Sequence, residues 1–246
     1  MIKLPNHLMS KLHFSGDQKR IDELLDSIKG EETLFDFNTI IPMPESLNIE
    51  EGSRTDNGLK AYKDFITAYT MDGTEKKDLM NIPKEKEEIF LRMRPDIKRD
   101  EWELGKMAFQ NKQKYGSTSW YDWRIDHWGS KWGAYQAELV EDNTIEFNTA
   151  WSNVKPVILA LSEKFPDVEM NYQWSDEDIG CNMGDVTFKD GECIDSIEFE
   201  AFSKEAFEFA AEMWGFDLEE EGYIFNEKTG TYEWQDMDIA ESQTMG

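Results

Sequence analysis

Residues 8–14 read LMSKLHF, a run in which apolar and polar side chains alternate. Leu8, Leu12 and Phe14 fall on one face of an extended chain, and the residues between them fall on the opposite face. This two-residue period predicts a strand with one buried face. Apolar residues then recur at helical spacing over residues 17–30. The chain therefore opens with a strand and an amphipathic helix, the first half of a βαβ unit.

The second half of this pattern lies more than 100 residues further on. Residues 144–151 alternate again, and residues 134–140 are expected to form their partner strand. A helix is predicted over residues 153–165, followed by a strand over residues 170–174. The order strand, helix, strand, strand, helix, strand predicts an α+β fold with the antiparallel, ferredoxin-like split βαβ sheet.

The remaining segments are an insertion and an extension. Residues of about 45–118 interrupt the pattern after the first helix and are expected to form two or more helices. Residues 186–199 predict a hairpin, with strands at 186–188 and 194–199, that extends the sheet. We therefore expect a ferredoxin-like domain over residues 1–200 and an acidic helix-hairpin extension over residues 201–246.

Composition favours a folded protein of the cytoplasm. Hydrophobic residues make up 39% of the 246 residues and aromatic residues 13%, enough for a substantial core. The N-terminus has no signal-peptide pattern, and the longest compact apolar run, residues 157–161, is too short to cross a membrane. Cys181 and Cys193 lack the spacing of a zinc site and are expected to be reduced thiols. The oligomeric state stays open.

Charge is concentrated in the C-terminal third. Of the net charge of −26, residues 161–246 contribute −20, from 24 acidic and 4 basic residues. The electrostatic field of this negative charge repels the phosphates of nucleic acid and favours binding to a basic protein surface. The alternative is that these carboxylates only keep the protein soluble. The expected partner-binding residues are Asp217, Glu219, Glu220 and Glu221.

A tryptophan-rich segment, WYDWRIDHWGSKW over residues 120–132, offers two interpretations. In the first, its rings and charged groups line a pocket that stacks a planar ligand. In the second, which we favour, the spacings of three and four place the indoles on one helical face, packed against the sheet as core. The ligand-binding candidates are Trp120, Trp123, Arg124, Asp126, His127, Trp128, Lys131 and Trp132.

No catalytic, cofactor or metal site is predicted. His7 and His13 share a strand face but are separated by roughly 20 Å, too far to bind one metal ion. His127 lies beside a carboxylate, but nothing in the sequence nominates a nucleophile. The acidic stretch 175–178 lacks the pattern of a calcium loop and is interpreted as a solvated turn. We expect a protein that is not an enzyme.

Several short motifs carry a resemblance to a known family. They are Asn6-His7-Leu8, FNTIIPMP at 37–44, the tryptophan-rich segment, FNTAWS at 147–152, Phe165-Pro166-Asp167 and Gly180-Cys181-Asn182. Together they resemble the YubB-like ferredoxin-domain family of phages, plasmids and integrative elements, over most of residues 5–200. The resemblance implies a ferredoxin-like fold and a mobile-element origin, and it implies no mechanism.

Two functions follow as expectations. The first is a mobile-element accessory protein that acts by binding. Its acidic C-terminal portion would engage a basic host protein, such as a nucleic-acid-binding defence factor, without contacting nucleic acid or membrane directly. The alternative is a small-molecule binding protein or sponge that takes a nucleotide-like ligand in the tryptophan-rich segment.

Overall fold

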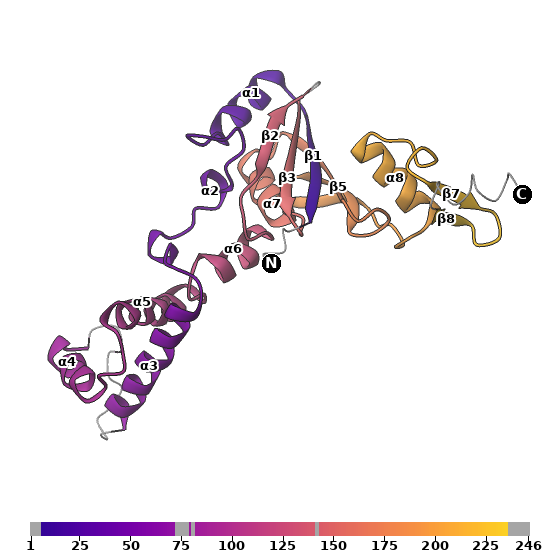
Figure 1. The fold of residues 1–246 in the computed structure, drawn as a ribbon. Coiled ribbons are helices and arrows are strands. Elements are labelled where there is room, and N and C mark those ends of the chain that lie inside the picture. The colour runs from indigo at the N-terminus through magenta and orange to yellow at the C-terminus, as the bar shows by residue number, and fades with distance from the viewer. Residues whose placement is uncertain (1–5, 72–78, 80–81, 141–142, 236–246) are drawn as a thin grey trace, which may run out of the picture. The chain divides into compact units, whose positions relative to one another are not determined.

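The computed structural model describes residues 6–71, 79, 82–140 and 143–235 (Figure 1). The chain forms two compact units. Met1–Pro42 and His127–Gly246 form one of them, which we call the sheet unit, and Met43–Asp126 forms the other, which we call the helical unit.

Six antiparallel strands form the sheet, in the order β2-β3-β1-β4-β5-β6. Their bounds are β1 His7–Ser15, β2 Tyr135–Leu139, β3 Thr144–Ala150, β4 Glu169–Asp176, β5 Met183–Lys189 and β6 Glu192–Ile197. β1 lies between β3 and β4, and β2 flanks β3, which is the arrangement of the split βαβ motif. The predicted α+β, ferredoxin-like fold is confirmed, and the β5–β6 hairpin extends the sheet as expected.

Helices α1 (Gln18–Ser27) and α7 (Lys155–Lys164) lie on one face of the sheet (Figure 1). The alternation predicted for residues 8–14 is observed, because every second side chain of β1 is buried. Asp17 caps α1, its carboxylate accepting a hydrogen bond from the Arg20 N–H. The opposite face of the sheet carries polar side chains, and we call it the open face.

A short connection after α1 completes the core of the sheet unit. Phe35 precedes the helical turn α2 (Phe37–Ile40). The rings of Phe35 and Phe37 pack edge-to-face, with their centroids 5.1 Å apart. Each ring also contacts Phe147 of β3 in an edge-to-face arrangement. Aromatic pairs of this geometry add to the stability gained from burial alone. Phe37, the first residue of the 37–44 motif, therefore has a packing role.

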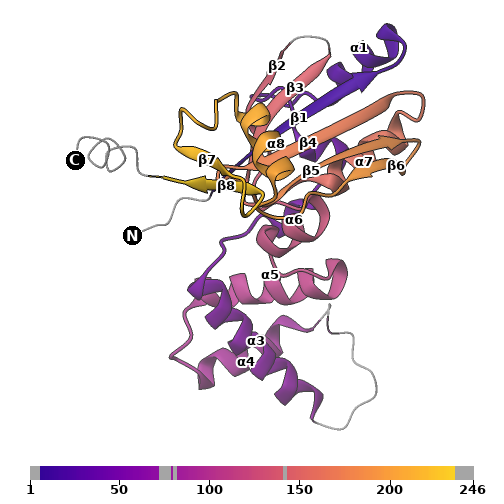
Figure 2. The ribbon, with the colours of Figure 1, turned by 90° about the vertical axis from the view of Figure 1, so that its right-hand side faces the viewer.

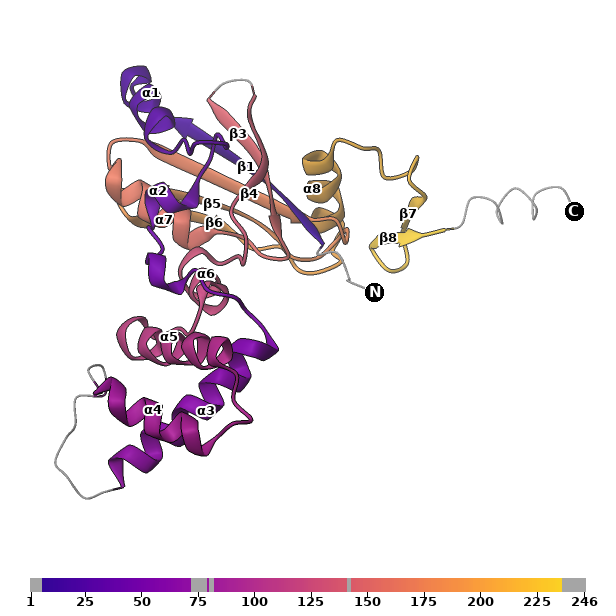
Figure 3. The same cartoon turned by 60° about the vertical axis from the view of Figure 1, so that its left-hand side comes forward.

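The described residues of the helical unit form four helical elements and most of a fifth (Figure 3). They are η1 Glu45–Leu47, α3 Ser53–Thr70, α4 Lys84–Met93, α5 Arg99–Tyr115 and the first residues of α6, Trp120–Trp128. The predicted helical character of residues 45–118 is confirmed. A buried cluster between α3 and α5 includes Tyr62, Phe65, Trp102 and Phe109.

The C-terminal elements are α8 (Lys204–Trp214), β7 (Tyr223–Asn226) and β8 (Thr231–Trp234). Phe207 of α8 packs on the rings of Tyr223 and Tyr232 in the hairpin. The Trp214 indole N–H donates to the backbone oxygen of Asp176, which ties α8 to the end of β4. These elements belong to the sheet unit.

The last strand of the sheet differs from its expected boundaries. The strand expected over 194–199 ends at Ile197, and Phe199 instead stacks on Phe209 of α8, with centroids 4.5 Å apart. The chain leaves the sheet two residues early because it turns toward α8. The final part of the predicted extension, residues 236–246, lies outside the described residues.

Candidate functional site

The tryptophan-rich segment does not form a single helical face. α6 ends at Trp128, and Gly129 follows with a φ of +85°, a left-handed conformation that favours glycine. A Cβ at this position would lie 2.5 Å from the backbone oxygen of Asn153. The chain turns here toward β2, so Trp132 lies beyond the helix. The prediction that all four indoles share one helical face is therefore wrong.

Two of the four indoles are core residues. Trp128 is 3% exposed, and its indole N–H donates to the backbone oxygen of Ile41 at 3.0 Å. Its ring packs edge-to-face on Phe37. Trp123 is 5% exposed, within the helical unit. The expected burial is confirmed for both rings, but Trp123 is buried within the helical unit and not, as had been expected, against the sheet. A stacking pocket has to be formed without these two rings.

Other candidates from this segment are distributed along α6. The Arg124 guanidinium stacks on the Trp120 ring, 5.1 Å from its centroid, and both side chains are half-buried. Asp126 is exposed and His127 is half-buried. A guanidinium stacked on an indole is a stabilising cation–π contact within the helix. This pair has a structural explanation without any ligand.

Lys131 and Trp132 belong to a different group, which we call the lysine–indole cluster. The Lys131 ammonium lies 4.1 Å from the ring centroid of Trp132 and 3.9 Å from that of Trp151. Trp132 is 40% exposed and Trp151 is 41% exposed. The cluster thus offers one cation and two accessible aromatic rings at the end of β3. Trp151 was not among the predicted site residues, although the FNTAWS motif contains it.

The backbone beneath this cluster is held in a sparsely populated conformation. Trp151 has a φ of +64° and Asn182 a φ of +50°, both in the left-handed region. The Asn182 amide donates to the backbone oxygen of Trp151 at 3.0 Å and to the buried Asp176 carboxylate at 2.7 Å. Asp176 also accepts from the Asn6 side chain and from the Asp178 N–H. Such conformations persist where neighbouring contacts enforce them.

This network corrects the interpretation of residues 175–178. Ser175 and Asp176 are buried strand residues at the end of β4, not part of a solvated turn. Glu177 and Asp178 are exposed. The sequence motifs that contain Asn6, Trp151 and Asn182 meet here because β1, β3 and β4 are neighbours in the sheet.

The predicted acidic residues form the turn after α8. The Asp217 carboxylate accepts hydrogen bonds from the Glu219 and Glu220 N–H groups at 2.8 and 3.2 Å, which shapes the turn. Glu219, Glu220 and Glu221 present their side chains to solvent, and Asp217 is exposed as well. The structure therefore brings these four carboxylates together on one exposed turn.

Residues 202–234 carry further acidic groups, and we call this segment the acidic layer. It contains nine carboxylates, all on exposed residues: Glu205, Glu208, Glu212, Asp217, Glu219, Glu220, Glu221, Glu227 and Glu233. Its bases are Lys204, which pairs with Glu208 at 2.7 Å, and Lys228. Phe202 is 56% exposed and Trp234 61% exposed. Exposed aromatic rings thus lie in the same segment as the unbalanced carboxylates.

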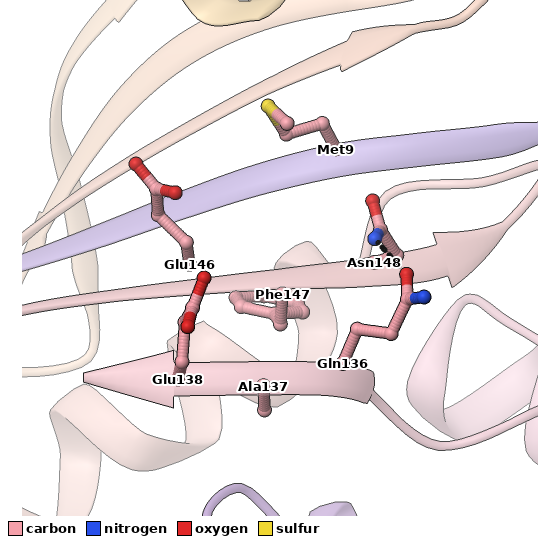
Figure 4. A pocket seen from close by; sticks show the side chains of 7 residues that line it. All are labelled: Met9, Gln136, Ala137, Glu138, Glu146, Phe147 and Asn148. Carbon is pink, nitrogen blue, oxygen red and sulfur yellow. Dashed lines mark hydrogen bonds between the residues drawn. The ribbon is translucent and has the colours of Figure 1, made fainter. Parts of the chain in front are cut away.

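A hollow of about 440 Å³ lies on the open face, over β1, β2 and β3 (Figure 4). Glu138 and Glu146 are directly opposite each other across the strand pair, and Lys11 forms an ion pair with Glu146 at 3.3 Å. A β-bulge lies between Tyr135 and Glu138, and Gln136 within it has a φ of +52°. Like charges placed opposite each other destabilise a strand pair. The hollow therefore suits a cationic group better than an anionic one.

The two histidines of β1 each contact a hydroxyl group on a neighbouring strand. The Nδ1 atom of His7 lies 2.9 Å from the Tyr135 hydroxyl, and that of His13 lies 3.0 Å from the Thr144 hydroxyl. Both cysteines are free thiols, as expected, and burial raises the pKa of the Cys181 thiol. Within the described part of the chain, no group of three or more His, Cys, Asp or Glu side chains is placed to hold a metal ion.

Comparisons with known proteins address the fold. Residues 127–217 match the family model of the ferredoxin-like domain in Api92-like protein. That segment holds β2 to β6, α7 and α8, together with Lys131, Trp132, Trp151 and Asp217. The match covers less than half of the chain and assigns a ferredoxin-like domain to this part.

A solved structure shows a distant likeness. The crystal structure of a protein api92 from Yersinia pseudotuberculosis is 12% identical to this chain, covers 80% of it and is itself covered over 99% of its length, with a TM-score of 0.39. No curated protein matches the chain. At this identity and TM-score, the likeness carries no argument about function. No helix in the described residues is both long and apolar enough to span a bilayer.

Proposed function

We propose that this chain is a non-enzymatic accessory protein whose acidic layer binds a basic protein. The resemblance to the YubB-like family favours a mobile element as its origin and a host protein as its target. A nucleic-acid-binding defence factor is the partner class that fits, because such proteins carry the Lys- and Arg-rich surfaces that bind phosphate. Binding of this kind would occupy the surface that the host protein uses for nucleic acid.

The observation that carries the proposal is the combination of charge and aromatic exposure in the acidic layer. Nine exposed carboxylates are accompanied by two lysines, one of them already paired with Glu208. A surface of this charge accelerates encounter with a basic partner and repels acidic ones. Phe202 and Trp234 add exposed aromatic area, and aromatic residues supply much of the binding energy in protein interfaces.

The test is an affinity capture from nuclease-treated host lysate over a series of salt concentrations. The variant Glu219→Gln, Glu220→Gln, Glu221→Gln removes three charges from the turn after α8. It is expected to retain a basic host protein at least tenfold less well than the wild type at low salt. Raising ionic strength should release the protein from the wild type, because screening shortens the reach of exposed charges.

A matched control separates local from global charge. The variant Glu31→Gln, Glu32→Gln, Glu85→Gln removes the same number of charges from exposed positions outside the acidic layer. It should retain the partner as well as the wild type does. Equal loss in both variants, or retention that does not change with salt, would contradict the proposal that this surface is the binding site.

A second candidate is supported by the lysine–indole cluster. The Lys131 ammonium between the Trp132 and Trp151 rings combines a cation with two surfaces on which a base can stack. A planar anionic ligand such as a nucleotide matches this combination. Relative to the predicted pocket, the site keeps Lys131 and Trp132 and adds Trp151.

Titration with nucleotides, monitored by tryptophan fluorescence, tests this candidate. Trp132→Ala should abolish quenching, whereas Trp234→Ala, which removes another exposed indole, should leave it intact. Circular dichroism of both variants verifies the fold. Quenching that persists in Trp132→Ala, or is absent in the wild type, would dismiss the cluster as a nucleotide site.

A further inference from the structure

The strand β6 is a free edge of the sheet. It lies at the end of the strand order opposite β2, and within the described residues it pairs with β5 alone (Figure 2). All six residues from Glu192 to Ile197 are exposed. An edge strand presents a row of backbone N–H and C=O groups that another extended chain can pair with.

A groove accompanies this edge on the face that carries α7. It has a volume of about 580 Å³, and Pro156, Leu159, Val186 and Phe188 give it an apolar lining. β6 contributes the small side chains of Cys193 and Ser196 to the same groove. Since these side chains are short, the groove leaves room for larger apolar side chains from a neighbouring strand.

The opposite face of β6 is acidic. Glu192 and Asp195 lie opposite Lys189 and Thr187 in the register with β5, on the alternate face from Cys193. Lys189 forms an ion pair with Glu169 at 3.6 Å. Glu198 and Glu200 follow the strand, and residues 191–203 contain no lysine or arginine. The groove side of β6 is thus lined by apolar side chains of α7 and β5, whereas the opposite face of β6 carries Glu192 and Asp195 together with the exposed Ile197.

A second copy of this chain does not fit this edge. Pairing of two β6 strands would bring the Glu192 and Asp195 carboxylates of each copy close to those of the other, and like charges across a strand pair are destabilising. A basic segment has the complementary charge. Lys155 also lines the groove, and its ammonium lies over the Trp174 ring, 5.3 Å from the ring centroid.

We propose that β6 accepts an extended segment of a basic protein as an additional antiparallel or parallel strand. The segment alternates apolar residues, which enter the groove, with lysine or arginine residues, which face Glu192 and Asp195. Its backbone pairs with the free edge of β6. The basic character of the partner rests on the proposed function, while the strand-pairing site is separate from the acidic layer.

The probe is an acetylated seven-residue peptide that alternates lysine and valine. Its binding is measured on the full chain carrying Cys181→Ser, in which Cys193 is the remaining thiol. Because Cys193 is exposed and lines the groove, a bound peptide should slow its reaction with a thiol reagent at least fivefold. Hydrogen exchange should slow at the amides of residues 192–197.

Two controls address the mode of binding. The same peptide with N-methyl groups on alternate amides keeps its charge and side chains but loses backbone donors, and it should bind at least tenfold more weakly. Ser196→Trp fills the groove and Asp195→Lys reverses a charge opposite the peptide, and each should weaken binding to a similar degree. The variant Glu219→Gln, Glu220→Gln, Glu221→Gln should bind the peptide as the wild type does.

These peptide and variant experiments distinguish strand addition at β6 from binding by the acidic layer. Normal peptide binding by the acidic-layer variant, with loss in Asp195→Lys, supports strand addition even if the acidic layer binds nothing. Equal protection of Cys193 by the N-methylated peptide would overturn strand addition and leave simple charge attraction. Absence of protection by the alternating peptide, or unchanged exchange at β6, would overturn it as well.

Discussion

Substitution of Gly105 by alanine should destabilise the helical unit, because α3 and α5 contact each other there through their backbones. A Cβ at Gly105 would lie 1.9 Å from the carbonyl carbon of Gly58. A Cβ at Gly58 would lie 1.8 Å from the backbone oxygen of Glu101. Both distances are far below van der Waals contact, so the two helices have to separate to admit one methyl group.

The size of the effect follows from two opposing terms. Alanine in place of glycine stabilises a helix by roughly 1 kcal/mol. Overpacking costs about 1–3 kcal/mol, and the upper end applies because no side chain can rotate away from a backbone clash. Separation of the helices also loosens the contact between Tyr62 and Trp102, whose centroids are 5.0 Å apart. We expect a net loss of about 2 kcal/mol for Gly105→Ala.

Thermal unfolding, monitored by near-ultraviolet circular dichroism, measures this effect. A loss of about 2 kcal/mol lowers the melting temperature of a domain of under 100 residues by roughly 8–16 °C. Gln113→Ala, on the exposed surface of α5, serves as the control and should change it little. A melting temperature for Gly105→Ala equal to or above that of the wild type would refute the close approach of the two helices.

Three further substitutions test buried polar groups by urea unfolding. Tyr172→Phe should cost about 1–3 kcal/mol because the Val154 N–H loses its acceptor. Burial raises the pKa of Tyr172 to about 12, so this residue's stabilising effect should be lost as pH rises from about 10 through 12, and Tyr172→Phe should remove that loss. Asp176→Ala should cost about 2–4 kcal/mol, since three donors lose a carboxylate, and a cost below 1 kcal/mol would contradict the network. Glu87→Gln should cost about 1–3 kcal/mol by removing the carboxylate that pairs with Lys106 at 2.7 Å, whereas Glu85→Gln should be neutral.

The strands and helices of the sheet could be predicted because their side chains repeat with the period of the element. The alternation in residues 8–14 and the helical spacing in residues 17–30 both reflect burial of one face, and both are observed. The end of β6 at Ile197, in place of the expected residue 199, could not be predicted. An apolar residue such as Phe199 suits both a strand of the sheet and a contact with a helix. Its contact with Phe209 of α8 is a tertiary contact that no local period encodes.

The candidate sites could be predicted only in part. The surplus of carboxylates is a property of composition, so the acidic layer follows from counting charges. The lysine–indole cluster does not, since Trp151 and Lys131 lie 20 residues apart and meet only because the chain turns at Gly129. Spacings of three and four placed Trp132 on a helix that ends at Trp128. A helical period alone does not show where the helix stops.

The sequence by itself determined the ferredoxin-like sheet, the helical insertion and the acidity of the C-terminal third, because periodicity and charge are local properties. Only the tertiary structure decided which tryptophans are core and which are exposed, and which strands form the edges of the sheet. Those properties depend on contacts between segments distant in the sequence. Asp176 shows the difference: it stands in an acidic stretch, yet the sheet buries it and surrounds it with hydrogen-bond donors.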